Sequence, residues 1–413
     1  MRRREFLANA GLTLGAALAG ISGPGTRALV APIIDKSVGP VGVRGTFGQG
    51  WSDPPLRWMV TRFAHAMPAA ASDIQLLYAN VTRRREEFES AGPNPITVSA
   101  AIEFPGGGFH RATFSGRPEI TVAGGETVIS DTVRVSIPAQ TVYYTRTTVR
   151  AEAAPYLWPF TRVSSPHCGD WVNKGNDPTQ ISDDPPARRD QQSKAFGPLN
   201  ILGKTERPHV SVAVLGDSVV AGEPGPGDRL GGRGFAERAL AANVAWCNLA
   251  VNGDNLAGFL KSHDTRLGVL RQNFTHVICA LGIGDIRGGN EPMIRERYLQ
   301  VWQLLSELGL KVFQTTITTH TSSSDGWTTV EGQKIVNPNF LPGGIYHRIN
   351  DWIRSRPKPL SGHFDPSALL ETEPDSGIWI APDRAAVTND GPHLNGLGAE
   401  IGARSVDLAK LTL

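Results

Sequence analysis

Apolar and polar residues alternate over several short runs in the first third of the chain. In the run 132–137, Thr-Val-Arg-Val-Ser-Ile, every second side chain is apolar. A period of two is typical of a β-strand with one buried face. Similar runs, and the Gly- and Pro-rich turns between them, occur at 96–102 and 141–145, and at 92–95, 106–108 and 124–125. Short strands at this spacing predict a β-sandwich-like accessory domain over residues 40–150.

The next segment, 151–205, has little periodicity. It is rich in Pro, Gly, Asp, Asn and Ser, and it is longer than ordinary loops. We therefore expect an irregular linker or a functional loop there. Its aromatic residues favour a packed segment over a disordered one; they are Tyr156, Trp158, Phe160 and Trp171.

From about residue 206 the pattern changes to continuous apolar runs that alternate with helical spacing. The runs are 210–215, 276–281 and 311–316. Between the last two, one helix face is expected to carry Met293, Leu299, Trp302, Leu305 and Leu308, and a closing helix is expected from Gly396 to Leu411. This alternation predicts an α/β domain over 206–413, with three layers and a mainly parallel sheet as in flavodoxin-like folds. Ligands of such sheets bind at the carboxyl ends of the strands.

The N-terminus has the pattern of an export signal. Arg3-Arg4-Glu5-Phe6-Leu7 precedes the apolar segment 11–21, which is shorter than the ~20 residues that a membrane span needs. The arginine pair and Phe-Leu resemble a twin-arginine signal, so we expect a signal peptide over 1–31, recognition by the twin-arginine export machinery, and a periplasmic or secreted protein without stable membrane insertion. A general secretory signal and an uncleaved anchor are the alternatives.

Composition and charge limit which partners and cofactors the sequence predicts. The 413 residues include 41 Lys and Arg and 39 Asp and Glu, so the net charge of +2 gives no indication of a nucleic-acid partner. The basic run Arg83-Arg84-Arg85 is followed at once by acids, which predicts a solvated surface. Three cysteines lack metal-ligand spacing, and Cys247 and Cys279 lie in apolar runs, so we expect no metal and no cofactor.

Chemically distinctive residues follow the apolar runs in a fixed order. Gly216-Asp217-Ser218 follows the first run, 248–254 reads Asn-Leu-Ala-Val-Asn-Gly-Asp, 281–285 reads Leu-Gly-Ile-Gly-Asp, and 390–393 reads Asp-Gly-Pro-His. Together these four blocks resemble the GDSL, or SGNH, hydrolase family over about half of the chain. The glycine-rich stretches 222–227 and 231–234 match neither a P-loop nor a dinucleotide fingerprint.

The resemblance implies a catalytic triad. Ser218 would be the nucleophile, His393 its general base, and Asp390 the residue that orients the imidazole and stabilises its charged form. A surface loop capped before the last helix is the alternative interpretation of the Asp390–His393 pair alone.

The resemblance also implies an oxyanion hole, with one departure from the family pattern. Ser218 and Gly253 would donate their backbone N–H groups. The third donor would be an asparagine side chain, but Gly284 occupies that position. Asn252 and Asn255 are candidate substitutes, although a turn role suits both. His320 and Trp327 follow another strand and are candidates for the rim of the cleft, where ordinary loop roles remain the alternative.

These residues predict an exported serine ester hydrolase that works through an acyl-enzyme. Acetyl groups on an extracellular polysaccharide are the preferred substrate class, because export and a β-rich accessory domain suit a carbohydrate esterase; lipid and small aryl esters stay open. Two alternatives remain: an acyltransferase that delivers the acyl group to a sugar hydroxyl, and a carbohydrate-binding protein with a weakened hydrolase site.

Overall fold

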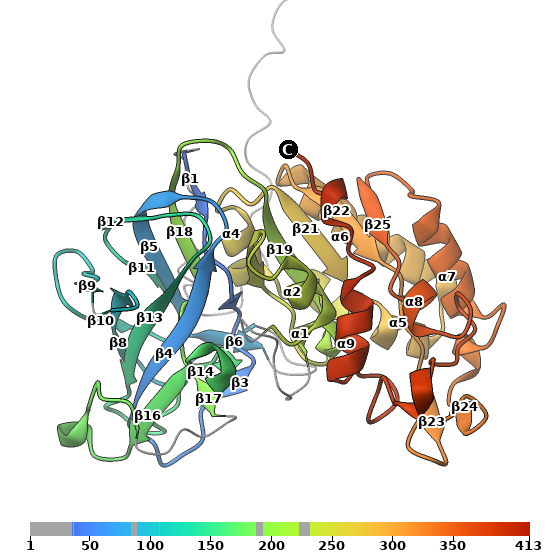
Figure 1. Ribbon diagram of the computed structural model, residues 1–413, viewed down its shortest axis with the longest axis horizontal. Helices are drawn as coiled ribbons and strands as arrows, with labels where there is room; N and C mark the ends of the chain where they lie inside the picture. Colours follow the sequence, from blue (N-terminus) through green and yellow to red (C-terminus); the bar gives the residue numbers. More distant parts are fainter. Residues whose placement is uncertain (1–34, 36, 84–88, 107, 187–192, 223–231) are drawn as a thin grey trace, which may run out of the picture.

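The computed structural model describes residues 35, 37–83, 89–106, 108–186, 193–222 and 232–413. The expected signal peptide, 1–31, lies outside these residues. Two β-sheets form the left-hand part of Figure 1, and a parallel sheet with its helices forms the right-hand part. No described helix has the length and apolar character that crossing a membrane requires.

Two antiparallel sheets make up the β unit. The first has the order β1 (Val38–Pro40), β18 (Asn200–Thr205), β5 (Ala71–Ala79) and β11 (Thr127–Ile129), with β12 (Val133–Ile137) also paired to β5. The second has the order β10 (Ile120–Val122), β8 (Ile96–Glu103), β13 (Thr141–Arg150), β4 (Trp58–Met67) and β16 (Trp171–Gly175), with β9 (Phe109–Arg111) on β8.

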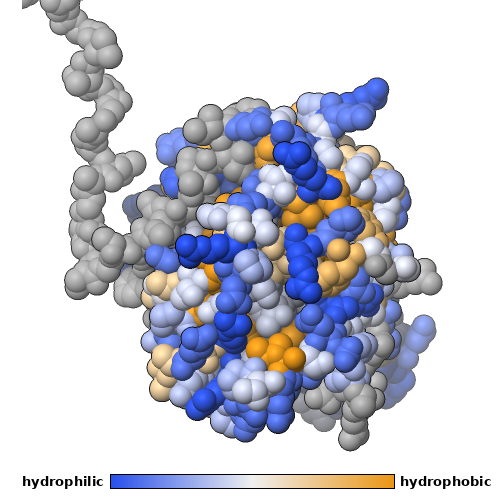
Figure 2. All heavy atoms as spheres, turned by 90° about the vertical axis from the view of Figure 1, so that its left-hand side faces the viewer, coloured by the Kyte–Doolittle hydropathy of each residue, from blue (hydrophilic) through white to orange (hydrophobic). Residues whose placement is uncertain are grey.

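A shared core joins these two sheets. Ile74 and Tyr78 of β5 belong to the same buried cluster as Met59 and Phe63 of β4. Along β12 the exposure alternates as the sequence predicts, because Val133, Val135 and Ile137 point inward and the two residues between them are exposed. The outer face is mainly hydrophilic, with separate hydrophobic patches (Figure 2). The β unit is therefore built as two packed sheets with a shared apolar core.

The segment 151–205 contains more regular structure than expected. Both β16 and β18 fall inside it. In the β unit, β16 is the edge strand beside β4, and β18 lies between β1 and β5. Short pairs also tie the segment down: β14 (Pro159–Phe160) with β3 (Gly50–Trp51), and β15 (Arg162–Val163) with β17 (Lys194–Ala195). The expectation of an irregular linker is wrong for these strands, because their partners lie far away in sequence and leave no local periodicity.

The parallel sheet has the order β2 (Gly45–Thr46), β20 (Ala245–Asn248), β19 (Ser211–Gly216), β21 (His276–Ala280), β22 (Lys311–Thr315) and β25 (Gly362–Phe364). Every neighbouring pair is parallel. The edge strand β2 comes from the N-terminal part of the chain, more than 150 residues before β19. The fold of this part is thus α/β, as the sequence predicts.

Helices cover both faces of the parallel sheet. Successive side chains of β19 point to opposite faces, and each set packs against a different group of helices. Ala213 and Leu215 belong to a core cluster with α3 (Leu256–Lys261), α4 (Asp264–Leu270), α5 (Ile283–Gly288), α6 (Glu291–Glu307) and α7 (Ile345–Arg354). Val212 and Val214 belong to another cluster with α1 (Ser218–Ala221), α2 (Phe235–Leu240), α8 (Ser367–Leu370) and α9 (Gly396–Ala403).

The remaining described elements are short. They are the hairpins β6 (Val81–Arg83) with β7 (Glu89–Ala91) and β23 (Thr321–Ser323) with β24 (Gln333–Ile335), and the 3-10 turns η1 (Pro166–Cys168), η2 (Pro178–Gln180), η3 (Pro338–Phe340), η4 (Pro382–Arg384) and η5 (Leu408–Lys410). The expected C-terminal helix therefore ends at Ala403, and η5 follows it.

Two local predictions need correction. On α6 the buried side chains are Ile294, Tyr298, Val301, Trp302 and Leu305, whereas Met293 and Leu299 are each 40% exposed. The buried face follows i, i+4, i+7, i+8 and i+11, so the predicted face was misplaced by about one residue at its start. Arg83 is 3% exposed, so the start of the basic run is buried rather than solvated. Residues 84–85 lie outside the described residues.

The two parts of the fold also share one core. Leu77 of β5 and Leu199, just before β18, belong to the cluster that contains α3 to α7, together with Phe47 after β2 and Val81 of β6. The apolar contacts therefore continue from one part into the other, and buried ion pairs such as Arg162–Glu237, 3.0 Å apart, lie beside them.

Candidate active site

Ser218 lies at the tight turn between β19 and α1. The strand ends at Gly216, and Asp217 caps the helix by accepting a hydrogen bond from the Val219 N–H at 3.0 Å. A Cβ atom on Gly216 would approach Val220 Cγ2 to 2.2 Å, so the turn requires glycine there. The chain consequently presents Ser218, which is partly exposed, at the carboxyl end of a central strand.

The structure brings Ser218, His393 and Asp390 together. His393 Nε2 lies 2.7 Å from Ser218 Oγ, and His393 Nδ1 lies 2.5 Å from Asp390 Oδ2. Asp390 Oδ1 also accepts the His393 backbone N–H at 3.0 Å. Serine, imidazole and carboxylate thus form one continuous hydrogen-bonded line, the arrangement that a nucleophile with a general base requires.

The loop that carries Asp390 and His393 is fixed from several sides. The Trp379 indole N–H donates to the Gly391 carbonyl at 2.7 Å, and the Asn395 side chain caps α9 by accepting from the Gly398 N–H. Gly391 has a φ of 102°, and a Cβ atom there would lie 2.0 Å from the Thr321 carbonyl oxygen. Only glycine fits this close approach, which helps to hold the loop from Asp390 to His393 in place.

Two candidate oxyanion donors, the backbone N–H groups of Ser218 and Gly253, lie in turns that are hydrogen-bonded to each other. The Asp254 N–H donates to the Val251 carbonyl at 3.1 Å and closes a turn in which Gly253 has a φ of 76°. The Val251 N–H in turn donates to the Gly216 carbonyl at 3.0 Å, which holds this turn beside the nucleophile turn. The N–H groups of Ser218 and Gly253 donate to no other described residue, so both are available to a developing negative charge.

Gly284 lies on the exposed start of α5. A Cβ atom there would make ordinary contacts, 3.5 Å from Asn255 Cβ and 3.7 Å from the Asp254 carbonyl oxygen, and its φ is not in the left-handed region. Glycine is therefore not required by the backbone at this position. Of the two candidate substitutes, Asn252 is exposed, and Asn255 caps α3 by accepting the Gly258 N–H at 2.8 Å.

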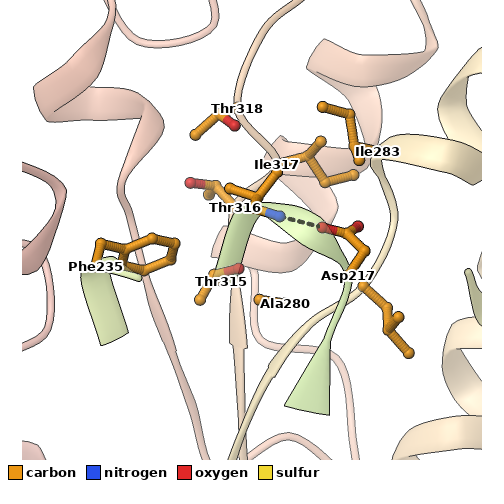
Figure 3. A pocket seen from close by; sticks show the side chains of 10 residues that line it. Asp217, Phe235, Ala280, Ile283, Thr315, Thr316, Ile317 and Thr318 are labelled. Atoms are coloured by element: carbon orange, nitrogen blue, oxygen red, sulfur yellow. Dashed lines mark hydrogen bonds between the residues drawn. The ribbon is translucent and has the colours of Figure 1, made fainter. Parts of the chain in front are cut away.

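A small pocket of about 20 Å³ lies beside the nucleophile turn (Figure 3). Its lining comes from the ends of β19, β21 and β22 and from the starts of α1, α2 and α5: Asp217, Val219, Phe235, Ala280, Leu281, Ile283, Thr315, Thr316, Ile317 and Thr318. The sequence analysis placed the segment after β22 at the cleft rim but did not identify this pocket. The signal was present, because the lining residues follow three adjacent parallel strands.

Two buried acids near the nucleophile turn resist ionisation. Burial raises the pKa of Asp217 to about 7 and that of Asp285 to about 6, and Asp254 contributes to both shifts by its negative charge. The Asp217 Oδ2 atom has no hydrogen-bond partner among the described residues. Neutral acids at these positions would put less negative charge near a forming oxyanion than two carboxylates would. The sequence analysis missed both roles, because burial has no local sequence pattern.

His320 and Trp327 take different places. Burial lowers the pKa of His320 to about 4, while Asp390 and His393 are near enough to influence it electrostatically. A Cβ atom on Gly391 would lie 3.4 Å from His320 Cδ2. His320 thus lies beside the triad loop and is neutral at neutral pH. Trp327 instead donates its indole N–H to Thr321 Oγ1 at 2.9 Å.

Comparisons with known proteins add a set of structural likenesses. No protein-family model and no curated protein matches the sequence significantly. Among the solved structures, a GDSL-like lipase from Bacteroides thetaiotaomicron is 16% identical, with a TM-score of 0.35; the match covers 48% of this chain and 87% of the lipase. The sequence motifs resemble the same class of enzyme.

Two further solved structures match most of the chain. A protein from Bacillus subtilis is 13% identical over 94% of both chains, with a TM-score of 0.36. A family two carbohydrate esterase from Clostridium thermocellum is 10% identical over 87% of this chain and 90% of its own, with a TM-score of 0.34. At such identities and TM-scores, arguments about chemistry rest on the geometry of the site.

Proposed function

We propose that this chain is an exported serine ester hydrolase of the SGNH/GDSL type, which cleaves carboxylic esters through an acyl-enzyme. The hydrogen-bonded line from Ser218 Oγ through His393 to Asp390 carries the proposal. A serine hydroxyl is a weak nucleophile unless a neighbouring base accepts its proton, and His393 Nε2 is already within reach of that proton.

The reaction follows from this geometry in two halves. Ser218 Oγ attacks the ester carbonyl carbon as its proton passes to His393 Nε2, and Asp390 stabilises the imidazolium that forms. The Ser218 and Gly253 N–H groups stabilise the negative oxygen. The tetrahedral intermediate expels the alcohol, which takes the proton from His393. Water then attacks the acyl-enzyme with His393 again as base, which releases the acid and restores Ser218.

A short acyl group suits the pocket beside Ser218. Its lining includes both sequence neighbours of the serine, Asp217 and Val219, and its volume of about 20 Å³ is small. An acetyl methyl group is a small apolar group that suits such a pocket. We therefore propose acetyl esters, with acetylated extracellular polysaccharide as the substrate class.

The test is turnover of p-nitrophenyl acetate and of longer-chain p-nitrophenyl esters. Ser218→Ala and His393→Ala should each lower kcat by about 1000-fold or more, because the two residues act as one proton-transfer unit. The exposed Ser361→Ala is the matched control and should keep wild-type kcat. A fluorophosphonate probe should label Ser218, as mapped by mass spectrometry. A folded Ser218→Ala protein with wild-type turnover would contradict the proposal.

A further inference from the structure

We propose that Arg83 of the β unit is a positioning residue for the oxyanion turn, acting through Asp254; the inference rests on the function proposed above. The turn that carries the Gly253 N–H ends at Asp254, whose own N–H closes it. Whatever fixes Asp254 therefore fixes the direction of the Gly253 donor.

Asp254 is held by one arginine from each part of the fold. Arg83 Nη1, from β6, lies 2.8 Å from Asp254 Oδ1, and Arg266 Nη1, from α4, lies 2.6 Å from Asp254 Oδ2. The exposed fraction is 4% for the Arg83 side chain and 0% for the other two. Each carboxylate oxygen thus has a guanidinium of its own, and both pairs are shielded from water and salt.

A second acid from the same hairpin completes the cluster. Glu89 of β7 lies opposite Arg83 in the strand register. Its Oε1 atom lies 3.1 Å from Arg266 Nε, and its Oε2 atom accepts the Thr265 N–H at 2.7 Å. The positive charges of the two arginines equal the negative charges of the two acids, and their attraction offsets the desolvation cost of burying four charged groups. The hairpin and the α/β part therefore meet through buried ion pairs behind the oxyanion turn.

The neighbouring helix is shaped to admit the Arg83 guanidinium. A Cβ atom on Gly258 of α3 would lie 2.4 Å from Arg83 Nη2 and 2.9 Å from Asp254 Oδ1. Glycine leaves that space open. Asp254 Oδ1 also accepts the Asn255 N–H at 2.9 Å. The carboxylate thus joins Arg83 to the C-terminal end of the turn that carries Gly253.

An oxyanion donor stabilises the transition state only when it points at the developing charge. Removing the Arg83 guanidinium leaves Asp254 tied to Arg266 alone and frees one side of the turn. Because the affected interaction exists mainly in the transition state, kcat should fall while KM changes little. Arg83→Met, which keeps most of the side-chain length, should lower kcat by about tenfold, a fraction of the ~100-fold that a lost donor costs.

The experiment measures kcat and KM for p-nitrophenyl acetate per reactive site, with sites counted by fluorophosphonate labelling of Ser218. A variant that is merely less folded has fewer reactive sites but an unchanged kcat per site. Arg44→Met is the matched control, because Arg44 forms a buried ion pair with Asp170 at 2.7 Å within the β unit, and both side chains are fully buried. It should keep wild-type kcat per site. Arg83→Lys, which keeps the charge, should lie between wild type and Arg83→Met.

Wild-type kcat per site in a folded Arg83→Met protein would overturn the inference, as would an equal loss in Arg44→Met. Where Arg83→Met does not fold, Arg83→Lys takes its place, and an unchanged kcat per site there has the same force. A wild-type protein that shows neither turnover nor labelling of Ser218 would instead overturn the proposed function itself.

Discussion

Restoring an asparagine at position 284 tests whether the oxyanion hole is one donor short. Gly284 occupies the place of the family asparagine, on the exposed start of α5. Its φ is outside the left-handed region, and a Cβ atom meets Asn255 Cβ and the Asp254 carbonyl at ordinary contact distances. Gly284→Asn should therefore be accepted without backbone strain.

The size of the gain follows from what one donor contributes. Loss of an oxyanion donor typically costs about 100- to 1000-fold in rate. A donor added to a site that lacks its usual supporting contacts should recover part of this. We expect a gain of about tenfold, which corresponds to about 1.4 kcal/mol of transition-state stabilisation. The gain should appear in kcat, since the negative charge exists only in the transition state.

Steady-state kinetics on p-nitrophenyl acetate provide the assay, and Gly288→Asn provides the control. Gly288 is the last residue of the same helix, and a Cβ atom there meets nothing within 4 Å. Its substitution should leave kcat unchanged. Asn255 is compared as Asn255→Ser rather than alanine, because its side chain caps α3 and serine is also a good helix cap. Asn252→Ala completes the set.

One result would refute the reasoning. If Gly284→Asn brings no gain and Asn255→Ser or Asn252→Ala loses about 100-fold in kcat while staying folded, the third donor has moved to that asparagine. The site would then be complete as it stands.

Three further outcomes are expected. Burial raises the pKa of Glu371 to about 8, so its contribution to stability is fully present below its ordinary pKa of 4.5 and is lost as the pH rises through 8. In thermal melts between pH 5 and pH 8, the Tm of Glu371→Gln should therefore fall less than the Tm of the wild type. An equal fall in both proteins would contradict this. Gly391→Ala should lower kcat at least about tenfold, because a Cβ atom would lie 2.0 Å from the Thr321 carbonyl oxygen and shift the loop. A tenfold loss corresponds to about 1.4 kcal/mol of transition-state stabilisation. Wild-type kinetics would show that the loop adapts. Changing Arg3 and Arg4 to lysine should hold the precursor in the cytoplasm in cell fractionation, whereas normal delivery would point to another export route.

The sequence indicated the candidate triad because each of its residues belongs to a motif next to a regular element. Ser218 follows an apolar run that forms a buried strand, and Asp390 and His393 precede a helix with its own cap. Adjacent parallel strands end at the same edge, so residues 175 apart could be expected to meet.

Other features depend on contacts that local patterns do not contain. The strands β16 and β18 find their partners about 100 or more residues earlier in the chain. Arg83 resembled a solvated charge because acids follow it, yet it pairs with Asp254, 171 positions away. The face of α6 was misplaced because Met293 and Leu299 are apolar but exposed. Apolar character alone does not distinguish a helix side that packs from one that faces water.

The edge strand β2 and the residue after it bear on how such a protein can evolve and be engineered. Gly45 and Thr46 pair with β20, and the fully buried Phe47 packs in the core of the helices α3 to α7. A shortened protein that began at residue 206 would present β20 as an open sheet edge, which invites aggregation. The α/β part from residue 206 onward thus depends on residues 45–47 to complete its sheet and its core. A chimera with a different β unit would need its own equivalents of residues 45–47. For the same reason, recombination that separated the two parts would give a less stable protein.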